Sequence, residues 1–201
     1  MDRLQQQLDF ILEIDKEKKI KRQTLLSDGL TFEDDAQHAW HMCVMTLLLS
    51  EYSNEKIDVL KTISMLLIHD LVEIDAGDTY AYDEKGIETQ SEREKKAADR
   101  IFNLLPSDQA QKIMDLWLEF EAYETPESKF AHTMDNFQPC MLNAHTNGKM
   151  WKEKKVHLKS ILKRNKKTSQ GSDVLWNYMY TNYIQPNVKV SNIILDEDKS
   201  Q

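Results

Sequence analysis

The stretch Leu66-Leu67-Ile68-His69-Asp70-Leu71-Val72-Glu73-Ile74 places three ionisable side chains inside an apolar run. Such a run is typical of a buried helix, where an unpaired carboxylate costs several kcal/mol or shifts its pKa to stay neutral. Buried carboxylates are therefore normally paired or bound to metal. On one helix, His69 and Glu73 would lie one turn apart, with Asp70 about 100° round from His69. We expect the three side chains to line one wall of a cavity.

The rest of the sequence also favours helices. Five glycines and four prolines are few interruptions in 201 residues, and apolar residues recur at spacings of three and four rather than in alternation. Three stripes predicted to pack on their neighbours are Leu4, Leu8, Ile11 and Leu12; Trp40, Cys43, Val44, Leu47 and Leu48; and Leu60, Ile63, Leu67 and Leu71. The prediction is an all-α fold in a single domain over 1–201, with a core at about 8–145 and a helical extension at about 149–201.

Helix starts are predicted at two places in the second half of the chain. Thr125-Pro126-Glu127 combines a capping threonine, a first-turn proline and a first-turn acid. Ser107 is predicted to cap the preceding helix. The longest connections, at 27–35 and 75–90, are expected to be functional loops.

Composition excludes several classes of protein. No apolar run approaches the roughly 18 residues of a membrane span, and the N-terminus does not resemble a signal peptide, so we expect a cytoplasmic protein with no membrane partner. Cys43 and Cys140 form no paired-thiol or zinc-binding spacing, which fits a reducing compartment. The formal charge of −8 argues against nucleic acid as a partner.

Two further residues turn the His69-Asp70 pair into a candidate metal site. His38 opens an earlier helix, and Asp135 interrupts the apolar face of a later one, where a carboxylate again needs a partner. The four residues would supply a cage of two imidazoles and two carboxylates from three helices. Such a cage suits a divalent transition metal.

Three segments of the chain carry a family resemblance. Glu33-Asp34-Asp35-Ala36-Gln37-His38 looks like a Glu-x-x-Ala-x-His motif, and the run from His69 to Asp78 is similar to an HD-x-x-E-x-x-x-GD signature. Pro126 to Asp135 resembles the stretch that ends in the last metal ligand. Together, over roughly residues 8–145, they resemble the HD-domain phosphohydrolases, within the branch of bacterial 5'-deoxynucleotidases and HD-domain-containing protein 2.

This resemblance implies an HD-domain helical bundle, a homodimer and a set of site residues. It makes His38, His69, Asp70 and Asp135 the metal ligands, Glu73 and Asp78 the catalytic carboxylates, and Arg22 the phosphate-binding arginine. The cofactor would be one divalent ion, chosen among cobalt, manganese, iron, nickel, zinc and magnesium. The substrate would be a small nucleotide.

The implied chemistry is coherent. A divalent ion lowers the pKa of its water, and Arg22 can hold a phosphate in a bidentate fork. The sequence allows Glu73 to orient the nucleophile and Asp78 to protonate the leaving 5'-oxygen, or the reverse. Arg22 is the one phosphate anchor visible near the motif, which favours nucleoside 5'-monophosphates as substrates.

Rival interpretations remain open at this point. Other HD enzymes cleave phosphodiesters, polyphosphates or nucleoside triphosphates, and a silent protein could keep the metal and nucleotide site without turnover. A nucleic-acid adaptor could use the basic segment 149–167, which we interpret instead as the solvated face of a helix. The branch usually has a tryptophan just after the arginine, where this chain has Gln23-Thr24, so sugar selectivity is open.

Several other side chains have two interpretations each. His41 is expected to support its helix rather than bind metal, and His132 could act behind Asp135. Tyr80 and Tyr82 could stack on a base or anchor their loop. The aromatic residues expected in the core or against a second subunit are Trp176, Tyr178, Tyr180 and Tyr183.

Overall fold

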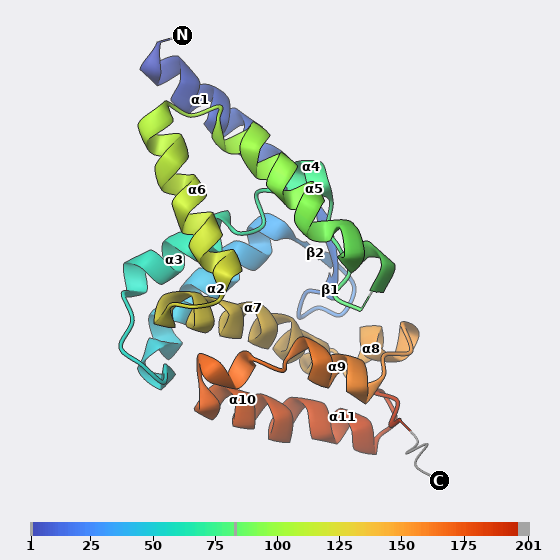
Figure 1. The fold of residues 1–201 in the computed structure, drawn as a ribbon. Coiled ribbons are helices and arrows are strands. Elements are labelled where there is room, and N and C mark those ends of the chain that lie inside the picture. The colour runs from blue at the N-terminus through green and yellow to red at the C-terminus, as the bar shows by residue number, and fades with distance from the viewer. Residues whose placement is uncertain (1, 83, 197–201) are drawn as a thin grey trace.

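The chain folds into a helical bundle with one small hairpin (Figure 1). The computed structural model describes residues 2–82 and 84–196. The helices are α1 (Arg3–Ile14), α2 (Asp35–Leu49), α3 (Val59–Ile68), α4 (Glu73–Ala76), α5 (Glu84–Phe102), α6 (Ser107–Ala122), α7 (Pro126–His145), α8 (Lys149–Glu153), α9 (Leu158–Arg164), α10 (Asp173–Met179) and α11 (Gln185–Lys189). Short 3-10 turns are η1 (Asp15–Lys19), η2 (Ser50–Tyr52) and η3 (Thr168–Gln170), and η4 (Tyr180–Ile184) is π-helical. The predicted helical bundle is confirmed.

The structure contains an antiparallel hairpin that the all-α prediction did not include. The strands β1 (Lys21–Leu25) and β2 (Phe32–Asp34) pair across a turn in which the Asp28 carboxylate accepts from the backbone N–H groups of Leu30 and Thr31. The expected loop at 27–35 is therefore partly a strand. Asp34 then caps α2 in a capping box with Gln37, so the hairpin leads directly into that helix.

Of the two predicted helix starts, the structure confirms the capping at Thr125 and not the capping at Ser107. Thr125 accepts from the backbone N–H of Ser128 and Pro126 is the first residue of α7, as predicted. Ser107 is instead the first residue of α6 and makes no capping bond, so that detail was wrong. The expected connection at 75–90 is shorter, because α4 ends at Ala76 and α5 begins at Glu84.

Helix α7 lies at the centre of the bundle and contributes more buried residues to one core than any other described element. Its buried side chains Phe130, Met134 and Phe137 pack with apolar residues of α2 and α3 and of the C-terminal elements. Gly171 lets the C-terminal segment cross α7 closely, because a Cβ there would lie 2.3 Å from the Lys129 carbonyl oxygen. The division into a core and an extension stays a prediction.

The apolar stripes predicted to be buried lie mostly on the surface. The exposed members are Leu4, Leu8, Ile11 and Leu12 of α1, Trp40, Val44, Leu47 and Leu48 of α2, and Leu60 and Leu67 of α3. Helices α2 and α3 bury other faces, through Met42, Met45, Met65 and Leu66. Both helices carry apolar residues on more than one face, so periodicity could not say which face is buried. In the described residues no helix is long and apolar enough to cross a bilayer.

The homodimer implied by the family resemblance stays a prediction, and these exposed side chains offer a way to test it. We expect light scattering coupled to size exclusion to give twice the mass of one chain, because a second copy would cover apolar surface. A charge placed among these residues, in Leu47→Glu, is expected to shift the mass to that of one chain. A wild-type protein that elutes as a monomer at tens of micromolar would contradict the dimer.

Candidate active site

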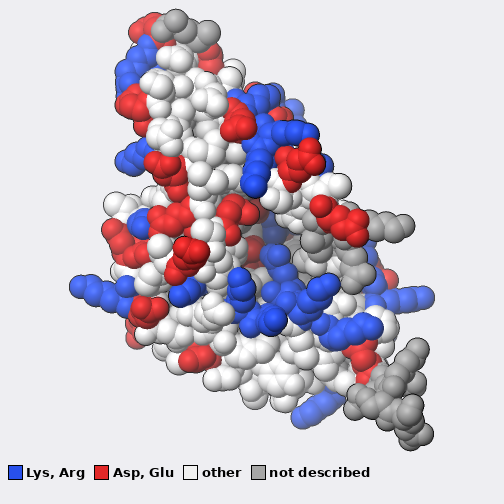
Figure 2. Space-filling model, viewed as in Figure 1, with Lys and Arg blue, Asp and Glu red and all other residues white. Residues whose placement is uncertain are grey.

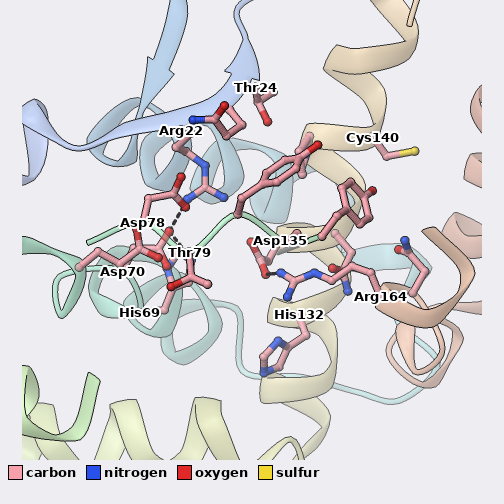
Figure 3. A pocket seen from close by; sticks show the side chains of 18 of the residues that line it. Arg22, Thr24, His69, Asp70, Asp78, Thr79, His132, Asp135, Cys140 and Arg164 are labelled. Carbon is pink, nitrogen blue, oxygen red and sulfur yellow. Dashed lines mark hydrogen bonds and ion pairs between the residues drawn. The ribbon is translucent and has the colours of Figure 1, made fainter. Parts of the chain in front are cut away.

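A cavity of about 240 Å³ lies between the hairpin, the segment after α3, and helices α5, α6, α7 and α9. Its walls include most of the residues singled out in the sequence: Arg22, His69, Asp70, Glu73, Asp78 and Asp135. Figure 3 shows Arg22, Asp70 and Asp78 on one side and Asp135 on the other. His38 lies fully buried, with its Nε2 3.2 Å from the Asp135 carboxylate. The structure thus brings all seven residues to one place.

The segment that carries the HD pair differs from its prediction. Helix α3 ends at Ile68, residues 69–72 form a turn, and the short helix α4 begins at Glu73. His69, Asp70 and Glu73 therefore do not share one continuous helix. The turn leaves all three side chains on the cavity wall, as expected.

Both imidazoles are held with Nε2 towards a common point. The Nδ1 of His69 lies 2.9 Å from the Leu66 carbonyl oxygen, an acceptor, so this nitrogen donates. The Nδ1 of His38 lies 3.0 Å from Oε1 of Gln138, whose Nε2 donates to Glu33. Each ring therefore turns its Nε2 towards a carboxylate, that of Asp135 for His38 and that of Asp70 for His69. Outer partners orient metal-ligating histidines in this way.

The donor atoms of three predicted ligands converge. Single ligand atoms of His38, His69 and Asp135 lie within 4.8 Å of one another. Nε2 of His69 has no hydrogen-bond partner, although it lies 3.1 Å from Oδ2 of Asp70. Burial alone would lower the pKa of His69, but Asp70 and Asp135 raise it to about 9. A position that attracts a proton this strongly also suits a metal cation, so these side chains fit a divalent ion.

Arg22 lies in a second cluster of acids beside the first. Ligand atoms of Asp35, Asp70 and Glu73 also lie within 4.8 Å of one another. The Nη1 of Arg22 donates to Asp70 at 2.7 Å and to Asp35 at 3.2 Å. Burial would raise the pKa of the Asp70 carboxyl, but His69 and Arg22 hold it well below its usual range. Asp70 is therefore the carboxylate shared by Arg22 and His69.

The other two acids of this cluster, Glu73 and Asp35, have raised pKa values, which favours their protonated forms. Burial, together with the charges of Asp70 and Asp35, raises the pKa of Glu73 to about 11. Burial and Asp70 raise the pKa of Asp35 to about 7. One oxygen of Glu73 and one of Asp35 are buried without a hydrogen-bond partner. Such oxygens are available to a bound cation, water or substrate.

Asp78 lies on the loop after Gly77, whose φ of 74° is in the left-handed region. Burial raises the pKa of the Asp78 carboxyl. Arg93 of α5 fixes this loop by donating to the Ala76 carbonyl and, at 2.7 Å, to the Thr79 hydroxyl. The loop is therefore anchored on both sides of Asp78.

Sequence reasoning missed several residues around the site. Asp35 and Glu33 are buried acids next to Arg22 and His38. Both stand in the Glu-x-x-Ala-x-His segment, where two acids at the start of a buried helix were an available signal. Gln138 and Arg164 had no comparable signal, because they act through contacts with residues 100 and 29 positions away.

The other histidines take supporting positions. His41 accepts from Nε2 of Gln138 at 3.1 Å, which links it to the partner of His38. His132 stacks between Phe120 and Tyr123, and its Nε2 lies 2.9 Å from the Phe120 carbonyl oxygen. Burial lowers the pKa of His132 to about 4, so its ring is neutral near pH 7.

The chain is similar to known proteins of one family. The sequence model of a family described as HD domain matches residues 14–176. The chain is 31% identical over 137 residues to 5'-deoxynucleotidase HDDC2 of Dictyostelium discoideum, covering 65% of this chain and 72% of that protein. It is 28% identical over 103 residues to 5'-deoxynucleotidase HDDC2 of Homo sapiens, covering 51% and 49%. The chain spans about half the length of most of the curated relatives it matches.

A solved structure is similar over almost the whole chain. The crystal structure of a protein from Magnetospirillum magnetotacticum MS-1, described as a predicted metal-dependent phosphohydrolase, is 43% identical and covers 95% of both chains with a TM-score of 0.89. That similarity includes the C-terminal elements beyond residue 145.

Proposed function

The chain belongs to the HD domain family, and on that premise we propose that it is a metal-dependent phosphohydrolase that removes phosphate from (deoxy)nucleoside 5'-monophosphates. The observation that carries the proposal is the convergence of His38, His69 and Asp135 next to the pair formed by Asp70 and Arg22 at one cavity. The names of the relatives and of the solved structure support the same reaction class.

In this proposal, His38, His69, Asp70 and Asp135 hold one divalent ion. The ion would supply Lewis-acid chemistry, lowering the pKa of a water molecule and polarising the phosphate. Arg22 would offer its guanidinium to the phosphate oxygens and neutralise charge as the P–O bond breaks. Glu73 and Asp78 supply the two carboxyl groups, one to orient and deprotonate water and one to protonate the leaving 5'-oxygen.

The far end of the cavity has features that suit a nucleoside. Asn143 lines it, is only 9% exposed, and has a buried Oδ1 without a partner, while its Nδ2 donates to the Pro139 carbonyl. An unpaired amide oxygen can accept from an N–H group of a base. Trp151 of α8 and Tyr82 add aromatic wall. These contacts favour a nucleotide over a small phosphate ester.

A substrate panel tests the proposal. Ribo- and deoxyribonucleoside 5'-monophosphates, crossed with cobalt, manganese, zinc and magnesium salts, are expected to yield inorganic phosphate and the nucleoside. Product identification separates the other HD reactions, since release of pyrophosphate or triphosphate, or opening of a phosphodiester, would replace this function by one of them. Absence of turnover with bound metal and bound nucleotide would favour a silent binding protein.

The cytoplasmic location stays a prediction.

A further inference from the structure

Arg164 reaches the cavity from α9, a part of the chain that the sequence motifs do not cover. Its Nη2 donates to Oδ2 of Asp135 at 2.9 Å. Figure 3 shows Arg164 extending towards Asp135 from the side opposite Arg22. The basic segment 149–167 therefore does more than present a solvated face, and the cavity contains a second guanidinium that the sequence did not indicate.

The two arginines have equivalent relations to the cage. Arg22 pairs with Asp70 at 2.7 Å, and Arg164 pairs with Asp135 at 2.9 Å. Each carboxylate proposed to bind the ion thus has one guanidinium as its partner. The two oxygens of Asp135 are divided between the cage and Arg164, because Oδ1 faces His38 and Oδ2 faces Arg164.

We propose that Arg164 is a second phosphate-binding residue, which holds a dianionic phosphate together with Arg22 from opposite sides. The inference rests on the proposed function. When the charges of Asp70 and Asp135 are compensated by a divalent cation, both guanidiniums lose part of their counter-charge. A phosphate dianion supplies two negative charges, and guanidinium is the side-chain group whose planar fork best matches phosphate oxygens.

The surroundings of Arg164 suit the arrival of such an anion. Its side chain is 42% exposed, so it is reached from solvent, unlike Arg22, which is 14% exposed. Figure 2 shows Lys and Arg side chains gathered around a hollow in this face of the molecule. Lys154 lies over the Tyr80 ring, 5.7 Å from its centroid, at the same cavity wall. In a chain with a formal charge of −8, this local concentration of cations steers anions to the cavity.

The experiment measures binding of inorganic phosphate to manganese-loaded protein by calorimetry. Arg164→Gln is expected to raise the phosphate dissociation constant about ten- to a hundredfold, the range for one hydrogen bond to a charged group, and Arg22→Gln is expected to do the same. Lys166→Gln removes a positive charge from an exposed position of the same segment and is expected to change phosphate affinity less than about twofold. Arg164→Lys keeps the charge but loses the planar fork of the guanidinium. Its phosphate dissociation constant is expected to lie between those of wild type and Arg164→Gln.

Manganese affinity, measured in the same variants, separates phosphate binding from a purely structural ion pair. A residue that only neutralises Asp135 would change manganese affinity and leave phosphate affinity unchanged. Phosphate binding by Arg164→Gln within about twofold of wild type would overturn the proposal, as would a wild-type protein that binds manganese but no phosphate. If no nucleotide is hydrolysed while phosphate binding still depends on Arg164, the proposed function fails and the phosphate site stands.

Discussion

His69→Ala and Asp70→Ala are each expected to abolish both metal binding and phosphate release. Nε2 of His69 is oriented by the Leu66 carbonyl and lies among the donor atoms of the cage, and Asp70 supplies its charge next to Arg22. Loss of an outer partner of a metal ligand typically costs about 10- to 100-fold in affinity, so loss of a ligand itself is expected to cost at least about a hundredfold. Metal content by mass spectrometry and phosphate release by colorimetry measure the two effects.

His145→Ala is the matched control for these variants. His145 lies at the end of α7 with an exposed side chain, so its removal tests for unspecific loss of a histidine. It is expected to keep metal and activity. Full activity in both His69→Ala and Asp70→Ala would show that the chemistry takes place elsewhere.

Glu73→Gln and Asp78→Asn are expected to lower kcat about 10²- to 10⁴-fold, the usual contribution of general acid or base catalysis, while the protein keeps its metal. Both side chains line the cavity. The variant that removes the base should lose the fall in rate at low pH, because that fall reports protonation of the base. The variant that removes the acid should lose the fall at high pH. The pH profile of kcat/KM thus decides the assignment that the sequence left open.

Asp75→Asn provides the control for the carboxylates. Asp75 lies in α4 two residues after Glu73 but pairs with Arg100 rather than lining the cavity. It is expected to leave the rate and the pH profile unchanged. A loss of activity that accompanies loss of metal in Glu73→Gln would instead make Glu73 a ligand.

The sequence could predict the site because its residues are chemically out of place. A histidine and two carboxylates inside Leu66–Ile74 are costly in a core unless they have partners, so burial and function were visible in the same stretch. The same reasoning found Asp135 in α7. It could not find Arg164, because a basic residue in a basic segment has an ordinary place at the surface, and its pairing with Asp135 depends on a fold that joins distant positions.

The fold was predicted less completely for a related reason. Periodicity identified helices but not their buried faces, since Trp40 and Leu47 of α2 are exposed while Met42 and Met45 are buried on the same helix. The hairpin was missed because a strand as short as β2 (Phe32–Asp34) gives too few alternations to read. Neither error displaced the site, because capping at Asp34 and the turn after Ile68 set the positions of His38 and His69.

The packing of α7 has a consequence for how the protein matures. All four proposed ligands have been translated once Asp135 is made, but the helix that carries Asp135 is covered by Ile161, Leu175 and Met179, which the ribosome adds later. A nascent chain that ends before these residues has the ligands without the apolar contacts that position one of them. Domains gain their packing as units when their sequence is complete. Acquisition of the metal is therefore expected to follow synthesis rather than accompany it, at the stage when the finished chain closes over α7.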